Sequence, residues 1–173
     1  LVLAGHSEGA LIAALAAEDA QARAVVSMAG AGSRASVLMR RQIEGHLPAD
    51  LADPALAALA ALEREEPVAD VPDALVLLFR PTVQPYLMSW FRHDPAEVLG
   101  KLALPVMLVH GSADTQVEVE HARLLQQGRP DAHFMLVDGM DHLLGLKGDI
   151  AGGVELVAAQ VADWLQELDV VAA

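Results

Sequence analysis

The fold is decided by residues 1–16, which read LVLAGHSEGALIAALA. The opening apolar run Leu1–Ala4 ends at Gly5 and predicts a buried strand. The stretch from Gly9 to Ala20 is apolar nearly all round, which predicts a helix that is buried on most sides. A second apolar run follows at Ala24–Ala29. Strand, helix and strand in this order are typical of the βαβ unit of a parallel sheet.

Residues 33–95 differ from this pattern, because they hold most of the chain's prolines and no clear strand. Asp53-Pro54 predicts a helix start, and that helix should run to about Glu66. Most of the chain's aromatic side chains fall between Phe79 and Phe91. We therefore expect a helical cap inserted into an α/β core.

The strand and helix pattern returns after the insertion. Two apolar runs predict strands, and each is followed by a predicted helix. The expected elements are strand 106–110, helix 117–127, strand 133–137 and helix 149–168. The fold class predicted from these patterns is α/β, a mostly parallel sheet flanked by helices. Its parts are residues 1–32 and 96–173 as the core and residues 33–95 as the cap.

Composition narrows the classes of partner. The chain has 173 residues, of which 54% are hydrophobic, and this apolar content excludes a disordered chain. Its formal net charge of −13 argues against nucleic acid or anionic membranes as partners. It has no cysteine, so disulfides and thiolate chemistry are excluded. No apolar run is long enough to span a bilayer. The chain begins at Leu1 inside a strand pattern, and we therefore interpret it as a fragment or processed product. No targeting signal is visible in this sequence, and a cytoplasmic location is the default expectation.

Gly5-His6-Ser7-Glu8-Gly9 is a G-x-S-x-G motif between a predicted strand and a predicted helix. A sharp turn at this point exposes the serine hydroxyl above the sheet, and the flanking glycines should leave room for strand and helix to approach. The backbone N–H of Glu8 would then point to where an oxyanion forms. The motif therefore predicts a nucleophilic Ser7.

A serine nucleophile needs a base and an acid that orients the base, and in this fold class they follow in the order serine, acid, histidine. Asp114 comes just after the third predicted strand, and His142 comes just after the fourth. Because parallel strands end at one edge of a sheet, Ser7, Asp114 and His142 should meet there. His142 would accept the Ser7 proton, and Asp114 would hold the imidazole in place.

Each candidate residue also has a plainer interpretation. Asp114 could cap the helix predicted from residue 117, and His142 could be a surface residue. His6 is interpreted as a packing residue beside the nucleophile or as a weak substrate contact, and His110 as structural. Four rival acids are set aside: two are assigned to a solvated helix face, and two flank the histidine too closely. They are Glu118, Glu120, Asp138 and Asp141.

These motifs resemble the α/β-hydrolases, in particular the branch with esterases, acylglycerol lipases and S33-type serine aminopeptidases. The resemblance covers essentially the whole chain and is carried by GHSEG at 5–9, by the stretch from Phe79-Arg80-Pro81 to Asp94-Pro95, by HGSAD at 110–114 and by GMDH at 139–142. It implies ester hydrolysis through an acyl-enzyme, with no cofactor and no metal. Tyr86 and Trp90 of the cap are expected as substrate contacts.

Two alternatives stay open at this point. The same triad serves amide or peptide cleavage, for which Glu8 could bind a substrate amine. The resemblance also implies strands before the nucleophile motif, with a loop that supplies a second oxyanion donor, so the chain could be an inert fragment. An uncovered first strand would favour a homo-oligomer.

Overall fold

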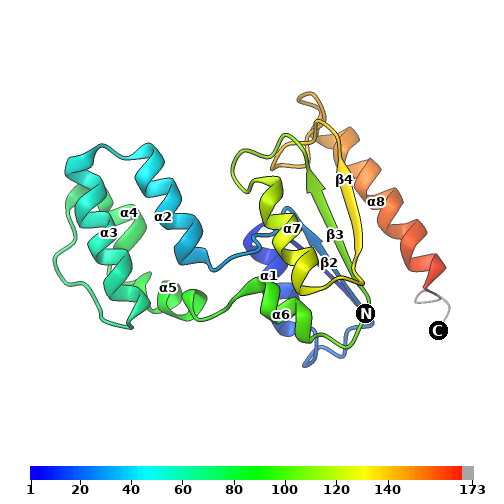
Figure 1. Ribbon diagram of the computed structural model, residues 1–173, viewed down its shortest axis with the longest axis horizontal. Coiled ribbons are helices and arrows are strands. Elements are labelled where there is room, and N and C mark those ends of the chain that lie inside the picture. The colour runs from blue at the N-terminus through cyan, green and yellow to red at the C-terminus, as the bar shows by residue number, and fades with distance from the viewer. Residues whose placement is uncertain (169–173) are drawn as a thin grey trace. The chain divides into compact units, whose positions relative to one another are not determined.

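The structure is a computed structural model that describes residues 1–168 (Figure 1). These residues form two compact units. The sheet unit consists of Leu1–Gly32 together with the chain from Pro95 onward, and the helical unit consists of Ser33–Asp94.

The sheet unit is built on four parallel strands in the order β1-β2-β3-β4. They are β1 (Val2–His6), β2 (Ala24–Met28), β3 (Val106–Gly111) and β4 (His133–Val137). Every residue of β3 is buried, as its unbroken apolar run predicts for a strand that is covered on both faces. The predicted four-stranded parallel sheet is confirmed.

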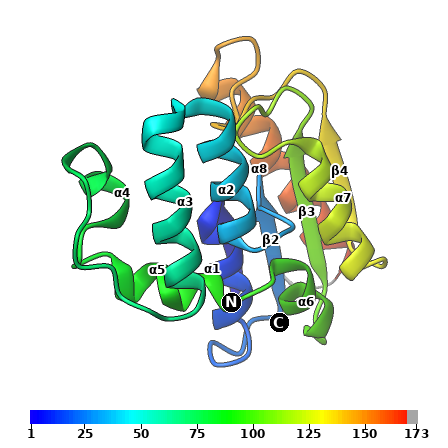
Figure 2. The same cartoon turned by 60° about the vertical axis from the view of Figure 1, so that its left-hand side comes forward.

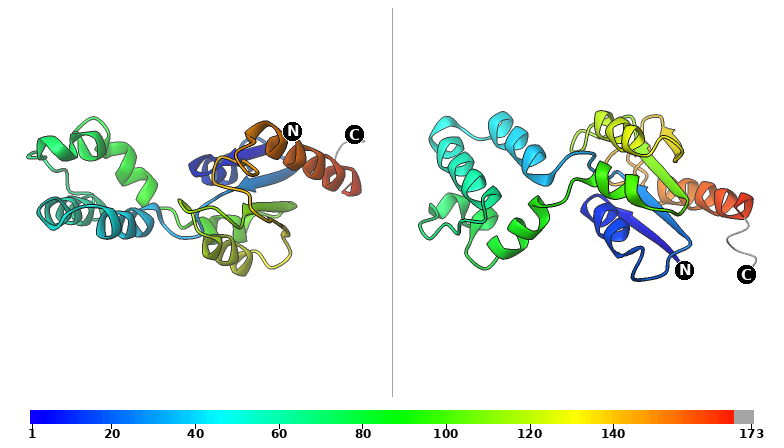
Figure 3. Two further views of the ribbon diagram at one scale, coloured as in Figure 1. Left: turned by 90° about the horizontal axis from the view of Figure 1, so that it is seen from above. Right: turned by 60° about the horizontal axis from the view of Figure 1, so that its bottom comes forward.

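Helices cover both faces of the sheet (Figures 2 and 3). One face carries α1 (Glu8–Ala16), α6 (Pro95–Lys101) and α7 (Val119–Gly128), while α8 (Ile150–Glu167) covers the other. The strands follow one another across the sheet without a reversal, so right-handed connections place the three connecting helices on the same face. No helix within residues 1–168 is long and apolar enough to cross a membrane.

Alternate residues of the strands supply two separate cores. Val25 and Leu108 pack toward α1, α6 and α7, in a cluster that includes Leu125 of α7. Their neighbours Val26 and Met107 pack toward α8. This alternation is the period of two that side chains follow along a strand, and it fixes the register of the sheet.

The expectation that the first helix is buried on most sides was wrong. Ala10, Ala13 and Ala14 of α1 are buried, but Ile12 is 55% and Leu15 is 42% exposed. The helix packs on the edge strand β1 and on β2, and α6 covers one flank. An apolar composition therefore did not translate into burial at the edge of the sheet.

The helical unit has its own hydrophobic core. Its elements are α2 (Ala35–His46), α3 (Ala49–Glu63), the short 3-10 helix η1 (Asp73–Leu75), α4 (Val76–Phe79) and α5 (Gln84–Phe91). Leu59, Leu62 and Phe79 are fully buried in this core. The buried amide of Gln84 donates to the carbonyls of Val68 and Phe79 and so ties the loop after α3 to α5.

The helix predicted from Asp53-Pro54 to Glu66 begins and ends earlier than expected. It is α3, which starts at Ala49 and contains Pro54 in its second turn. Proline there removes the hydrogen bond to the carbonyl four residues earlier, yet the helix continues to Glu63 and packs against α2 and α5. Glu65 adopts a left-handed φ of 62°, and the N–H of Glu66 bonds back to the carbonyl of Ala61, which ends the helix.

Candidate active site

The candidate site begins at the turn between β1 and α1. Strand β1 extends to His6 and α1 begins at Glu8, which leaves Ser7 alone between them. Ser7 has φ 55° and ψ −120°, a conformation that a residue with a side chain rarely adopts. Its N–H donates to the carbonyl of Met28 at the end of β2 (2.8 Å). The strained serine is thus held directly above the sheet.

The two glycines of the motif do not contribute equally. A Cβ built on Gly5 would collide with the carbonyl of Gly9, whereas a Cβ on Gly9 would meet nothing within 4 Å. The expectation that both glycines make room was therefore wrong for Gly9. Close approach of strand and helix requires only Gly5.

Asp114 lies in the loop between β3 and α7 and uses both carboxylate oxygens. Oδ1 accepts from the N–H groups of Gln116 (2.9 Å) and Val117 (2.8 Å), which closes the turn. Oδ2 accepts from Nδ1 of His142 (2.8 Å). Because α7 starts only at Val119, Asp114 caps the turn before the helix and at the same time holds an imidazole.

His142 lies in the loop between β4 and α8, next to a tight turn made by Asp141. Oδ1 of Asp141 accepts from the N–H groups of Leu143 (2.9 Å) and Gly145 (2.8 Å). A Cβ on Gly111 would collide with the carbonyl of Met140, so the end of β3 needs a glycine there. The N–H of Ala113 also donates to that carbonyl (3.0 Å). The loops that carry Asp114 and His142 are therefore in direct contact.

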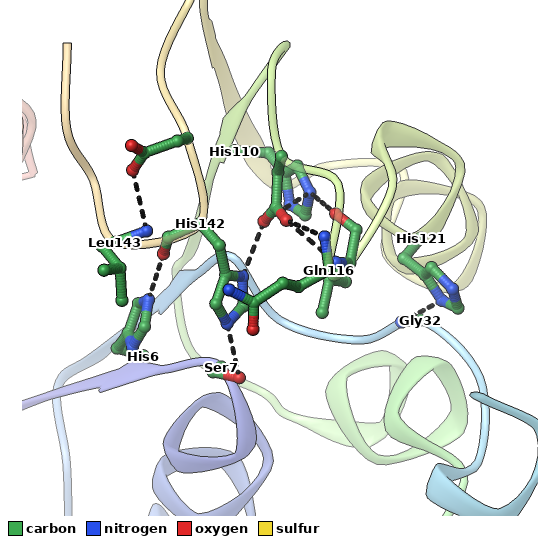
Figure 4. Close-up of polar contacts among 11 residues, drawn as sticks. His6, Ser7, Gly32, His110, Gln116, His121, His142 and Leu143 are labelled. Atoms are coloured by element: carbon green, nitrogen blue, oxygen red, sulfur yellow. Dashed lines mark hydrogen bonds and ion pairs between the residues drawn. The ribbon is translucent and has the colours of Figure 1, made fainter. Parts of the chain in front are cut away.

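One path of hydrogen bonds joins the three predicted side chains (Figure 4). Nε2 of His142 lies 3.1 Å from Oγ of Ser7, and Nδ1 of the same ring lies 2.8 Å from Oδ2 of Asp114. The Asp114 side chain is fully buried, and His142 is 8% exposed. A carboxylate buried from solvent favours the tautomer in which Nδ1 carries the proton. Nε2 is then free to accept a proton from Ser7.

Two further histidines flank this path, on either side of His142 in the view of Figure 4. Nε2 of His6 lies 2.6 Å from the carbonyl oxygen of His142. Nε2 of His110 lies 2.8 Å from the carbonyl oxygen of Val117 and 3.7 Å from Oδ2 of Asp114. His110 is 1% exposed, which fits the structural role that we expected for it. The sequence did not predict the bond from His6 to His142, although His6 lies in the serine motif and His142 was the predicted base.

Three of the four rival acids, Asp138, Glu120 and Asp141, bond to other groups. Asp138 accepts from the hydroxyl of Ser112 (2.9 Å), and Glu120 pairs with Arg123 on the exposed face of α7 (3.1 Å). Glu118 occupies the N-cap position of α7 without a capping bond from its side chain.

Glu8 follows Ser7 as the first residue of α1. Its backbone N–H belongs to the first turn, where N–H groups have no partner inside the helix and favour negative charge. Partial burial raises the pKa of its carboxyl above the usual value of 4.5. An anion formed on a substrate of Ser7 would thus find a helix N-terminus beside it.

Tyr86 and Trp90 lie on α5 in the helical unit, with ring centroids 5.9 Å apart. Tyr86 is 44% exposed, and Trp90 packs partly against the core of that unit. Their predicted role as substrate contacts stays a prediction. Within residues 1–168, no group of three His, Asp or Glu side chains could hold a metal ion.

Comparison with known proteins identifies the architecture. No protein-family model matches the chain. The chain is similar to the esterase EstD of Thermotoga maritima, with 28% identity over 143 residues, which is 81% of this chain and 34% of that protein. Among solved structures it is similar to Est1E from Butyrivibrio proteoclasticus, with a TM-score of 0.59, 20% identity, and coverage of 95% of this chain and 59% of that one.

The chain is similar to two other solved structures. One is MGS-MChE2, an α/β-hydrolase enzyme from a sediment metagenome, with a TM-score of 0.58, 19% identity, and coverage of 98% of this chain and 62% of that one. The other is the monoacylglycerol lipase of Paleococcus ferrophilus, with a TM-score of 0.53, 23% identity, and coverage of 95% and 67%.

The chain has the α/β-hydrolase fold. It spans about a third of the length of EstD and 59% to 67% of the α/β-hydrolase structures named above. Within this fold, Ser7 occupies the turn after β1, Asp114 the loop after β3 and His142 the loop after β4.

The glycines of the motif give a matched pair of substitutions. We expect Gly5→Ala to lower the free energy of unfolding by about 1–3 kcal/mol or more, because the new methyl group meets backbone that cannot move aside. Gly9→Ala enters open space in a helix and should leave stability unchanged or raise it by up to about 1 kcal/mol. Urea unfolding followed by circular dichroism measures both. Equal effects of the two substitutions would contradict the packing described for the turn.

The raised pKa of Glu8 predicts a pH dependence of stability. The carboxyl of Glu8 holds its proton more tightly in the folded than in the unfolded state. Its contribution to the free energy of unfolding therefore falls as pH rises from about 4.5 through the folded pKa. Glu8→Gln removes that loss. The free energy of unfolding of Glu8→Gln, minus that of the unsubstituted chain, should therefore be higher at pH 7 than at pH 4. Glu155→Gln, which replaces an exposed carboxylate on α8, is the control. A difference that does not change with pH would refute the assignment.

Proposed function

We propose that the chain carries the catalytic triad of a serine hydrolase that cleaves carboxylic esters through an acyl-enzyme. Ser7 is the nucleophile, His142 the general base and acid, and Asp114 the residue that orients His142. The observation that carries this proposal is the unbroken hydrogen-bond path from the buried Asp114 carboxylate through His142 to the strained Ser7. The similarity to the esterase EstD supports an ester as substrate.

The first half-reaction follows from these atoms. Oγ of Ser7 attacks the ester carbonyl carbon while its proton passes to Nε2 of His142, which lies 3.1 Å away. The carbonyl oxygen becomes an oxyanion, and the N–H of Glu8 at the start of α1 is the donor placed next to the nucleophile. The intermediate collapses as the imidazolium gives its proton to the leaving alcohol. An ester between Ser7 and the acyl group remains.

The second half-reaction repeats these steps with water. His142 removes a proton from a water molecule, whose oxygen attacks the acyl carbon, and the proton then returns to Oγ of Ser7. Throughout, Oδ2 of Asp114 accepts from the Nδ1–H of His142 and so stabilises the imidazolium. Its two bonds from the turn N–H groups keep that carboxylate in place as His142 changes charge.

A fluorophosphonate probe tests the nucleophile. We expect the probe to label Ser7, no labelling of Ser7→Ala, and a labelling rate for Asp114→Asn that is lower by on the order of 10³–10⁴. Ser89→Ala, which removes an exposed hydroxyl on α5, is the matched control and should label at the unsubstituted rate. Labelling that survives Ser7→Ala would refute the assignment of Ser7 as the nucleophile. If the unsubstituted chain is not labelled, the proposal fails and an inert fragment is favoured.

Amide cleavage by a serine aminopeptidase is the rival within the same chemistry. Glu8 is the carboxylate next to Ser7 in the chain and would have to bind the substrate amine. Rates on 4-nitrophenyl acetate and on an aminoacyl 4-nitroanilide separate the two functions. Faster turnover of the anilide, lost in Glu8→Gln, would favour the aminopeptidase.

Strand β1 also supports the proposal of a homo-oligomer. Within residues 1–168, β1 pairs with β2 alone, and Ala4 is exposed at this edge. We expect light scattering to show a dimer or larger species, because an open edge can pair with a second copy. Ala4→Lys should shift the chain to monomer, while Ala162→Lys on the exposed face of α8 should not. A monomer at high concentration before any substitution would refute this expectation.

A further inference from the structure

His6 has an unusual position, because it is the last residue of β1 and directly precedes the nucleophile. Its Nε2 lies 2.6 Å from the backbone carbonyl oxygen of His142, a residue 136 positions away in sequence. The two imidazole rings are tilted by 49°, with their centroids 5.0 Å apart (Figure 4). His6 therefore contacts both the backbone and the ring of the proposed catalytic base.

The chemistry of the contact fixes the direction of the hydrogen bond. A carbonyl oxygen can only accept, so Nε2 of His6 must carry the proton and donate. The neutral Nε2–H tautomer and the imidazolium both provide this donor. Because the carbonyl of His142 occupies this nitrogen, Nε2 of His6 is not free to contact a substrate.

The two ends of this bond differ in how firmly the backbone holds them. His6 pairs with Met28 in the parallel ladder of β1 and β2. His142 lies in a loop, two residues before Leu144, which has a left-handed φ of 63°. The bond from His6 links the backbone of that loop directly to the strand that ends just before Ser7. The same strand end thus positions both the nucleophilic hydroxyl and the backbone of its base.

We propose that His6 is a positioning residue that fixes the ring of His142 against Ser7 by donating its Nε2–H to the carbonyl of His142. This inference rests on the proposed function, since it assigns His6 a part in that same site. The distance from Nε2 of His142 to Oγ of Ser7 is 3.1 Å, which is near the limit for proton transfer. A displacement of about 1 Å at such a site can lower turnover on the order of 10²-fold.

Replacing His6 with Asn or Gln separates the loss of the hydrogen-bond donor from the change in side-chain size. The side chain of Gln places its N–H₂ about where Nε2 of His lies, whereas that of Asn is one methylene shorter and does not reach. We expect His6→Asn to lower kcat for 4-nitrophenyl acetate and the rate of fluorophosphonate labelling on the order of 10²-fold, with little change in KM. His6→Gln should recover most of the loss.

His46→Asn is the matched control, because His46 also contacts a backbone carbonyl through its imidazole, with Nδ1 3.0 Å from the oxygen of Gln42 on α2. It should leave both rates unchanged. Urea unfolding of each variant checks that the chain still folds. If His6→Asn fails to fold, His6→Leu, which keeps the bulk and lacks a donor, takes its place.

A spectroscopic measurement does not depend on turnover. In the ¹⁵N-histidine-labelled chain, the Nδ1–H of His142 should give a low-field proton signal because it donates to a buried carboxylate. His6→Asn should broaden this signal or speed its exchange with water, and His6→Gln should not.

The outcomes distinguish the two proposals. If the unsubstituted chain is not labelled, the proposed function fails, and the proton signal alone then decides whether His6 positions His142. If the chain is labelled but His6→Asn retains full kcat and an unchanged His142 signal, the role of His6 is overturned while the function stands. Equal losses in the Asn and Gln variants, or a loss confined to KM, would overturn it as well.

Discussion

The site depends on one constraint, the parallel pairing of four strands in sequence order. Parallel pairing places the carboxyl ends of β1, β3 and β4 at the same edge of the sheet, so the residues that follow them meet there although 135 positions separate Ser7 from His142. The close approaches at that edge occur where glycine removes a side chain. Gly5 admits the carbonyl of Gly9, and Gly111 admits the carbonyl of Met140. The fold therefore supplies most of the geometry, and only a few side chains complete it.

Asp114 illustrates how a single side chain serves both folding and the proposed chemistry. One oxygen closes a turn and the other holds His142, so the carboxylate is fixed before any substrate arrives. His110 supports the same turn by bonding to the carbonyl of Val117. A base oriented in advance by buried groups needs little reorganisation as it gains a proton, which is the main electrostatic advantage of such sites.

Much of this arrangement is predictable from sequence, because apolar runs and glycines mark the strand ends. The four strands and the meeting of Ser7, Asp114 and His142 at one edge of the sheet follow from that pattern. Local patterns failed where the outcome depends on distant neighbours. The exposure of Ile12 and Leu15 reflects the place of α1 at the sheet edge. Helix α3 runs through Pro54 and packs against α2 and α5, which the local sequence does not show. The bond from His6 to His142 joins the end of β1 to the loop after β4, and only the folded sheet brings these two together.

A crystal structure of the chain after reaction with a fluorophosphonate tests the central claim most directly. We predict a bond between the phosphorus atom and Oγ of Ser7, a phosphoryl oxygen within hydrogen-bond distance of the N–H of Glu8, and His142 still bonded to Asp114. A phosphorus atom attached to any other residue, or an imidazole of His142 turned away from Ser7, would contradict it.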